Sequence, residues 1–231
     1  MSSLSSMYIA LCLGLCVICC TAGQTCQHSG ADMLTEYTCG PSTNIQIDAS
    51  CDLPSYVPSG SAPSRFVAVI LTCDNSASEL HLTISGNDPS SLRELSVSQK
   101  RHFFLKGDVT LNLKYLKLVA INPDSNNPDG GIFMKSGALY TTHVWFDALY
   151  SGNDISIDGT TVPGDGGAIQ VISSTFTSQS SIIDLKESTF TNCKAKTRGG
   201  AVSVNDNYDL NIENTRFTSC ELIDSSGQRG G

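Results

Sequence analysis

The stretch RGGAVSV, from Arg198 to Val204, sets a pair of glycines before a short alternation of apolar and polar residues. The stretch DGGAIQV, from Asp165 to Val171, has the same form. Further glycine pairs lie at Gly130-Gly131 and Gly230-Gly231, and the intervals between successive pairs are 36, 33 and 31 residues. Self-similarity at a period in this range indicates a repeat architecture.

The alternation in each unit predicts a half-buried strand, because side chains along a strand point to opposite faces at a period of two. Ankyrin and tetratricopeptide repeats have a similar length, but they are helical and would space apolar residues by three and four. In the AVSV segment we expect Val202 and Val204 to point inward and Ser203 to point outward. A second strand-like piece in each unit ends in a phenylalanine, at Phe146, Phe190 or Phe217.

Strand units that each bury one face need neighbours to complete a core. We therefore predict an all-β fold, a right-handed parallel β-helix in which each unit forms one turn and stacked turns lie ~4.8 Å apart. The phenylalanines are expected to form an internal aromatic column. A tight corner that recurs in every turn favours glycine, which tolerates positive φ. The predicted corner residues are Gly130, Gly131, Gly166, Gly167, Gly199, Gly200, Gly230 and Gly231.

Looser versions of the same pattern extend upstream. Strand-like segments lie at Ser64–Cys73, Ser78–Gly86 and Arg101–Ile121, and we expect the coil to begin near residue 64. The segment Ser90–Lys100 is predicted to be a loop with a short strand. The chain is therefore divided into a signal peptide at 1–23, a cysteine-containing N-terminal cap with the first strands at 24–77, and β-helix repeats at 78–231.

The N-terminal segment has the pattern of a secretory signal peptide. From Met7 to Cys20 the chain is almost purely apolar, a run too short to cross a bilayer as a helix, and the small residues Thr21, Ala22 and Gly23 follow. No Lys or Arg precedes the apolar run, so an uncleaved anchor is the alternative. We expect a protein that is secreted or lies on the extracellular cell surface.

Six cysteines remain after the predicted signal peptide, and an even number in a secreted chain favours disulfides. A zinc site is the alternative, but no pair has the C-x-x-C spacing typical of such sites. Four of the six are expected to form two bridges at the first turn, with three connectivities left open: Cys26, Cys39, Cys51 and Cys73.

The other two cysteines, Cys193 and Cys220, occupy matching places in adjacent units. Stacked strands bring Cα atoms within the range of a disulfide, whereas the Cβ atoms can stay too far apart. The sequence therefore does not decide whether Cys193 and Cys220 form a disulfide.

Composition excludes some classes of partner. Only 16% of the 231 residues are charged and the formal net charge is −8, so nucleic acid is not expected as a partner. No segment after the signal peptide is apolar enough to span a membrane, so we expect membrane attachment only through a region beyond Gly231. We expect no cofactor.

The phrases GGAIQV and GGAVSV, together with STFTNC and TRFTSC, resemble the repeats of polymorphic outer-membrane proteins, which include chlamydial and protist surface proteins. Repeats of that family carry GGA followed by Ile, Leu or Val, and a second element Phe-x-x-Asn. In this chain Cys193 and Cys220 take the asparagine position. The resemblance covers about residues 78–231 and implies a right-handed β-helix displayed at a surface, usually with an adhesive role.

We therefore predict a non-enzymatic protein that adheres to a protein or glycan on the surface of a host or neighbouring cell. The alternative is a carbohydrate-active enzyme, such as a polysaccharide lyase or hydrolase, since such enzymes use the same coil with paired carboxylates or calcium. Asp154, Asp158 and Asp165 are weak calcium candidates, and ordinary turn residues are the plainer interpretation. The histidines are isolated in the sequence: His28, His81, His102 and His143.

The last residues, QRGG from Gln228 to Gly231, align with TRGG from Thr197 to Gly200, after which AVSV follows. The strand expected next is missing. A solenoid without a polar terminal unit leaves apolar side chains and strand edges in water. We therefore expect a fragment of a longer repeat protein, whose open last turn would associate with other copies.

Overall fold

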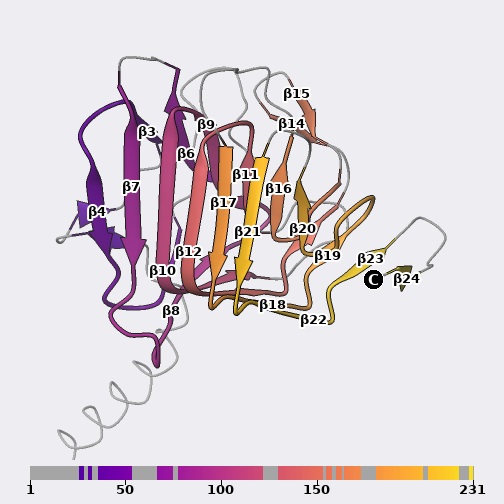
Figure 1. Cartoon of the computed structure of the whole chain (residues 1–231). Coiled ribbons are helices and arrows are strands. Elements are labelled where there is room, and N and C mark those ends of the chain that lie inside the picture. Colours follow the sequence, from indigo (N-terminus) through magenta and orange to yellow (C-terminus); the bar gives the residue numbers. More distant parts are fainter. Residues whose placement is uncertain are drawn as a thin grey trace, which may run out of the picture.

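The computed structural model describes residues 26–28, 31–32, 36–53, 67–74, 78–121, 130–152, 155–157, 160–162, 164–172, 181–204, 208–223 and 229–230. The predicted signal peptide at 1–23 lies outside these residues. Within them every regular element is a strand and most pairings are parallel, which confirms the prediction of an all-β fold with parallel sheets. Figure 1 shows the two largest sheets facing each other.

One of these sheets has six parallel strands, in the order β20-β16-β11-β9-β6-β3. Most of its length consists of strands that are buried on both faces rather than alternately buried and exposed. Its strands are β3 (Glu36–Thr38), β6 (Val67–Cys73), β9 (Arg101–Gly107), β11 (Ile132–Met134), β16 (Ile169–Val171) and β20 (Val202–Val204).

The facing sheet has ten strands, and its main path is β21-β17-β12-β10-β7-β4. These strands are β4 (Thr43–Gln46), β7 (Leu80–Ser85), β10 (Val109–Ala120), β12 (Ala138–Asp147), β17 (Ser181–Lys186) and β21 (Tyr208–Glu213). The second halves of β10 and β12 pair with shorter strands. These are β8 (Arg93–Val97) beside β10 and β18 (Thr189–Thr191) beside β12, and they pair in turn with β5 (Cys51–Asp52) and β22 (Arg216–Thr218).

Three smaller sheets complete the described structure. A four-stranded sheet has the order β13-β19-β23-β24, and each of the other two is an antiparallel pair, β1 with β2 and β14 with β15. Their bounds are β13 (Tyr150–Ser151), β19 (Lys194–Ala195), β23 (Glu221–Ile223), β24 (Arg229–Gly230), β1 (Gln27–His28), β2 (Ala31–Asp32), β14 (Ile155–Ile157) and β15 (Thr160–Val162).

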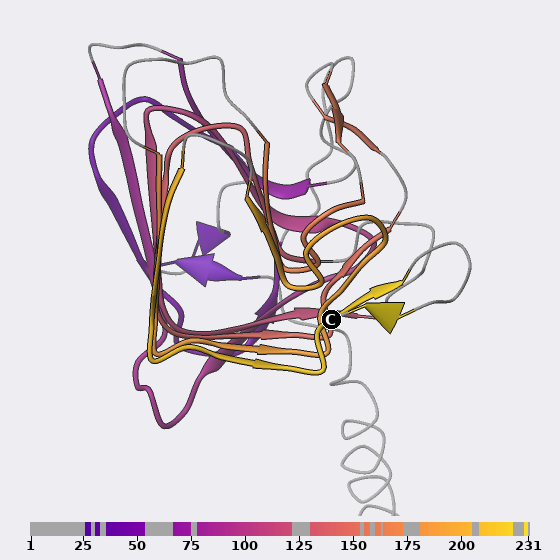
Figure 2. The ribbon, with the colours of Figure 1, turned by 45° about the vertical axis from the view of Figure 1, so that its right-hand side comes forward.

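The chain visits the sheets in a recurring order. Along the chain, a strand of the six-stranded sheet is followed by a strand of the ten-stranded sheet, and we call each such round of the chain a pass. Each new strand pairs with the corresponding strand of the previous pass. Register is kept from pass to pass, since Ile132 pairs with Ile169 and Ile169 pairs with Val202. In Figure 2 successive passes follow closely parallel paths.

Parallel pairing begins earlier in the chain than residue 64, where the sequence placed the first turn. Tyr37 in β3 pairs with Leu71 in β6, and Ile45 in β4 pairs with Ile84 in β7. The N-terminal segment therefore supplies the first strands of both large sheets. Its short strands carried too little alternation for the sequence to reveal this.

The interior between the two large sheets is built from columns of stacked side chains. One column runs through Val69, Phe103, Ile132 and Ile169, all of them fully buried, and ends at the half-buried Val202. Each added strand thus covers the apolar residues of the one before it, and the last strand is covered least.

The three phenylalanines form one of these columns. The ring centroids of Phe146 and Phe190 lie 4.5 Å apart, and those of Phe190 and Phe217 lie 4.8 Å apart, with the rings nearly parallel. Phe146 and Phe190 are fully buried, whereas Phe217 is 44% exposed. The column therefore begins inside the core and ends at the surface.

In the AVSV segment the valines pack against the core as predicted, but the outward-facing serine is covered rather than exposed. Ser203 is buried, while Val202 and Val204 are half-buried, although both valines pack against the core. Ser203 pairs with Gln170, which is also fully buried, because the outer face of the six-stranded sheet is covered as well. A second apolar cluster lies on that outer face, formed by Val67, Ile70, Phe104, Phe133 and Ile172.

Glycine pairs lie at bends shortly before three strands of the six-stranded sheet, β11, β16 and β20. Positive φ angles occur at Gly130 (81°), Gly131 (83°), Gly166 (57°) and Gly199 (58°). A Cβ atom on Gly131 would overlap the carbonyl oxygen of Ala168 in the next pass. Glycine is needed here both for the backbone conformation and for the close approach of the neighbouring strand.

The last glycine pair is arranged differently. Gly230 in β24 pairs antiparallel with Leu222 in β23, whereas Gly199 lies in the bend three residues before the parallel strand β20 begins. Gly231 lies outside the described residues. The alignment of QRGG with TRGG in sequence therefore does not correspond to stacked backbone positions.

Non-glycine residues form two further sets of bends, which the sequence did not reveal. Tyr115, His143, Glu187 and Asn214 have φ angles of 56°, 52°, 48° and 49°, and register places them at the same point of successive passes. We call these four residues the left-handed bend column. The second set comprises Ala148, Asn192 and Ser219.

His102 is a fully buried histidine that links the two large sheets. Its Nδ1 accepts a hydrogen bond of 2.8 Å from the amide of Gly131, so Nε2 carries the proton and donates to the carbonyl of Leu95 over 2.9 Å. Burial lowers the pKa of His102 to about 4, and the charge of Arg101 acts in the same direction. The side chain is therefore neutral at physiological pH.

Acidification is expected to destabilise the protein through His102. In the unfolded chain the imidazole binds a proton near pH 6.5, whereas in the folded protein it resists protonation down to about pH 4. The contribution of neutral His102 to the free energy of unfolding is therefore complete above pH 6.5. It falls as the pH is lowered, and by pH 4.5 the free energy of unfolding has decreased by about 2–3 kcal/mol. Urea unfolding of the wild type and of His102→Gln at pH 7.5 and pH 4.5 measures this. Equal pH dependence in the two proteins would refute the assignment.

Candidate functional site

A pocket of about 330 Å³ lies on the outer face of the ten-stranded sheet, where β12 bends. Strands β12 and β18 form its floor, and the segment between β7 and β8 contributes Pro89 and Leu92. The remaining lining residues are His143, Val144, Trp145, Glu187 and Thr189. We call this feature the Trp145 pocket.

Two members of the left-handed bend column line the pocket. The Nδ1 atom of His143 lies 2.9 Å from a carboxylate oxygen of Glu187 in the next pass, and the ring of His143 contacts that of Tyr115 at a centroid distance of 5.7 Å. Left-handed backbone is strained for such side chains by about 1–3 kcal/mol, and such strain clusters at binding and active sites. The bend thus gathers an imidazole, a phenol and a carboxylate along one line.

Trp145 is held in place by its neighbours while 37% of it stays exposed. Its indole N–H donates to the hydroxyl of Thr191 over 3.1 Å, and the ammonium of Lys117 lies 4.8 Å from the ring centroid. Lys117 is in turn fixed by Asp147 at 3.0 Å and Glu94 at 3.6 Å. A cation over an aromatic face contributes about 0.5–1 kcal/mol at such a site.

The chemistry of the pocket suits a small polar ring. It offers the aromatic surface of Trp145, a carboxylate, an imidazole and the hydroxyl group of Thr189 on a framework of paired strands. Aromatic side chains contribute apolar contact at low entropic cost, and nearby acceptors fix the orientation of a ligand. No local pattern in the sequence marks Trp145, the one tryptophan of the chain, as part of a binding site.

Asp165 lies in a buried network at the corner before β16. It is 2% exposed, and Arg198 donates to its Oδ2 from Nη2 at 2.7 Å and from Nε at 3.0 Å. The two residues occupy the same place in DGG and RGG, and the amide of Gly166 donates to the carbonyl of Arg198. The stacking of the DGG and RGG motifs therefore places the carboxylate of Asp165 next to the guanidinium of Arg198.

A buried arginine lies beside this pair. Arg101 is 1% exposed, and its Nη2 donates to Ser151 Oγ at 2.6 Å and to Gln170 Oε1 at 2.8 Å. Burial lowers the pKa of Arg101 to about 10, while the charge of Asp165 opposes that shift. Arg101 is thus charged at neutral pH, and Asp165 supplies its counter-charge.

The predicted calcium candidates are not brought together in the described part of the chain. Asp154 and Asp158 lie outside the described residues, and Asp165 is engaged with Arg198. Among the residues with described positions, no group of three or more His, Cys, Asp or Glu side chains is arranged to hold a metal ion.

The four N-terminal cysteines form two disulfides, as predicted. Cys26 is joined to Cys51 with a Cα–Cα distance of 4.9 Å, and Cys39 to Cys73 with a distance of 4.7 Å. This pairing selects one of the three connectivities that the sequence left open. Cys193 and Cys220 are free thiols.

Compared with known proteins, the chain matches no family model, no curated protein and no solved structure. Within the described ranges, no helix is long and apolar enough to cross a membrane.

Proposed function

We propose that the chain is a secreted, right-handed parallel β-helix that acts as a non-enzymatic interaction module and binds a surface glycan in the Trp145 pocket. The strand order supports the coil, because each pass of the chain adds one strand to the same edge of both large sheets. Connections between parallel strands of one sheet are right-handed in about 98% of proteins, which supports the proposed hand.

The relation to polymorphic outer-membrane protein repeats belongs to the same proposal. The stacked phenylalanines and the glycine bends before β16 and β20 agree with what that resemblance implies. Secretion is supported by the two disulfides, since such bonds persist in oxidising compartments.

The Trp145 pocket is the observation that carries the binding role. Its aromatic surface is held by Lys117 and Thr191, so little side-chain freedom would be lost when a ligand binds. Glu187 and Thr189 supply acceptors for sugar hydroxyl groups beside the ring. We expect a neutral or basic saccharide, because the ammonium of Lys117 is already paired with Asp147 and Glu94, and the pocket lining presents the carboxylate of Glu187.

Binding is tested by presenting the protein to a glycan array and titrating the best ligand by calorimetry. Trp145→Ala is expected to raise the Kd at least tenfold, because a central aromatic contact commonly contributes 2 kcal/mol or more. Glu187→Gln is expected to weaken the same ligand.

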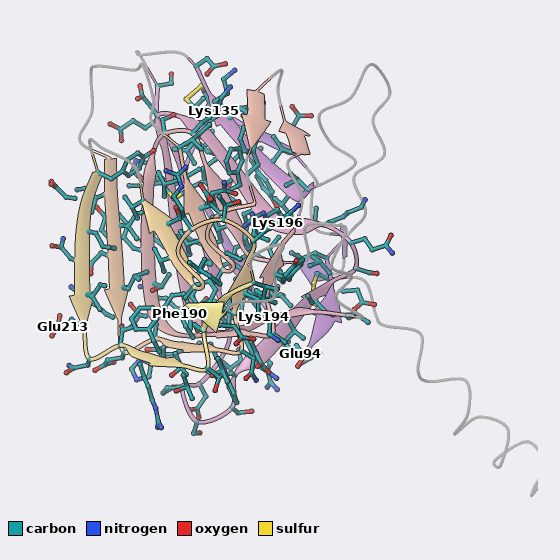
Figure 3. All side chains as sticks on the ribbon, turned by 90° about the vertical axis from the view of Figure 1, so that its right-hand side faces the viewer. Glu94, Lys135, Phe190, Lys194, Lys196 and Glu213 are labelled. Atoms are coloured by element: carbon teal, nitrogen blue, oxygen red, sulfur yellow. A yellow bond between two sulfur atoms is a disulfide. The ribbon has the colours of Figure 1, made fainter. Side chains whose placement is uncertain are left out.

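Glu213→Gln is the matched control, since Glu213 lies at the end of β21, is exposed (Figure 3) and does not line the pocket. Binding that survives Trp145→Ala would contradict the pocket assignment. Release of shorter saccharides from the ligand would instead support the carbohydrate-active enzyme that the sequence left as the alternative.

A further inference from the structure

Cys193 and Cys220 lie next to each other on adjacent passes of the chain. On one side of them β18 pairs in register with β22, and on the other side β19 pairs in register with β23. The amide of Glu221 donates to the carbonyl of Cys193 over 2.9 Å, so the ladder continues between these pairs. The two cysteines are therefore stacked neighbours.

The backbone presents both thiols in the same way. Each cysteine follows a left-handed residue, Asn192 with φ 55° and Ser219 with φ 54°. Each Sγ atom also lies 3.6 Å from the carbonyl oxygen two residues earlier in the chain. The two side chains thus leave neighbouring strands in the same direction.

Another stacked pair in this protein is already a disulfide. Thr38 in β3 pairs in register with Thr72 in β6, and the next residues, Cys39 and Cys73, are bonded with a Cα–Cα distance of 4.7 Å. Neighbouring cysteines on parallel strands of this fold can therefore form a disulfide, which meets the concern about Cβ separation raised by the sequence.

The two free thiols differ in their surroundings. Cys193 is fully buried, whereas Cys220 is half-buried in the last pass of the chain. A hydrogen bond from the Cys193 thiol lowers the pKa of Cys220 to about 6, and the same contact together with burial raises that of Cys193. Cys220 is thus the accessible thiolate at neutral pH.

We propose that Cys193 and Cys220 form an exchange-active dithiol that reduces disulfides and is itself oxidised to a cross-strand disulfide. The Cys220 thiolate attacks a disulfide RSSR, forms a mixed disulfide and releases one thiolate RS⁻, which takes up a proton. Cys193 then loses its proton and attacks the Cys220 sulfur, which releases the second RSH. Two protein thiols are oxidised and one RSSR is reduced to two RSH.

The proposal is tested on the folded chain with glutathione disulfide as RSSR, followed by alkylation and peptide mass spectrometry. We expect the Cys193–Cys220 disulfide to form, and a glutathione buffer to open and close it while Cys26–Cys51 and Cys39–Cys73 stay intact. Cys193→Ser should trap a stable mixed disulfide on Cys220. In the matched variant Cys220→Ser, Cys193 should react at least tenfold more slowly.

The pH dependence of alkylation gives an independent readout. In the wild type the rate of Cys220 alkylation should reach half its maximum near pH 6, and in Cys193→Ser the midpoint should rise toward the ordinary value of about 8.5. Circular dichroism checks that both variants fold. The proposal is overturned if glutathione disulfide leaves both wild-type thiols unchanged, if both carry glutathione without bridging, or if the bridge resists reduction as strongly as the other two disulfides.

Discussion

Phe190→Ala is expected to lower the free energy of unfolding by about 3–5 kcal/mol, the usual cost of removing a buried aromatic ring. Phe190 lies between Phe146 and Phe217 with ring distances of 4.5 Å and 4.8 Å and is fully buried. Its removal would leave a cavity in the middle of the column, because the paired strands above and below cannot close together. Chemical denaturation monitored by circular dichroism measures the loss.

Phe217→Ala is the matched control. It removes the same side chain from the same column, but Phe217 is 44% exposed and, among the rings with described positions, stacks on Phe190 alone. We expect a loss of about 1 kcal/mol, because much less apolar surface leaves contact with the protein. Equal losses at the two positions would show that the column is not organised as described.

Asp165→Asn is expected to destabilise the protein by about 3–5 kcal/mol, because it removes the buried partner of the Arg198 ion pair and the negative charge that offsets the burial of Arg101. The substitution keeps the shape of the side chain and removes its charge. Arg101, which is 1% exposed, would then be left in the interior without its counter-charge. Urea denaturation at neutral pH provides the measurement.

Asp74→Asn is the control for this substitution, because the carboxylate of Asp74, which pairs with Lys106 at 3.1 Å, is 53% exposed. Exposed pairs contribute about 0–1 kcal/mol, so little change is expected. A double-mutant cycle between Asp165→Asn and Arg101→Gln would measure the coupling directly. Additive effects would indicate that the two charges do not support each other.

The sequence predicted features that depend on period and residue type. The glycine bends before β16 and β20 and the alignment of Phe190 with Phe217 followed from a spacing of about one pass. Stacking makes such positions equivalent, so equal residues recur at equal places. The two N-terminal disulfides were predicted as a pair of bridges, and only the structure selected their connectivity.

Other features depend on whether the outer face of a sheet is covered by other parts of the chain. The alternation of apolar and polar residues along a strand does not encode this. Arg101 and Ser203 are buried because the outer face of the six-stranded sheet is covered as well as its inner face. The Trp145 pocket was missed for a related reason. It forms where Pro89 and Leu92 lie against a bend at His143, and no local sequence signal marks a left-handed histidine.

The left-handed bend column has a consequence for how new binding specificities can evolve. Its backbone conformation recurs at a tyrosine, a histidine, a glutamate and an asparagine, so it is imposed by the stacked strands and not by the residue at the bend. A mutation there can replace one functional group by another while the path of the chain stays the same. This edge of the protein can therefore acquire new recognition chemistry with little loss of foldability.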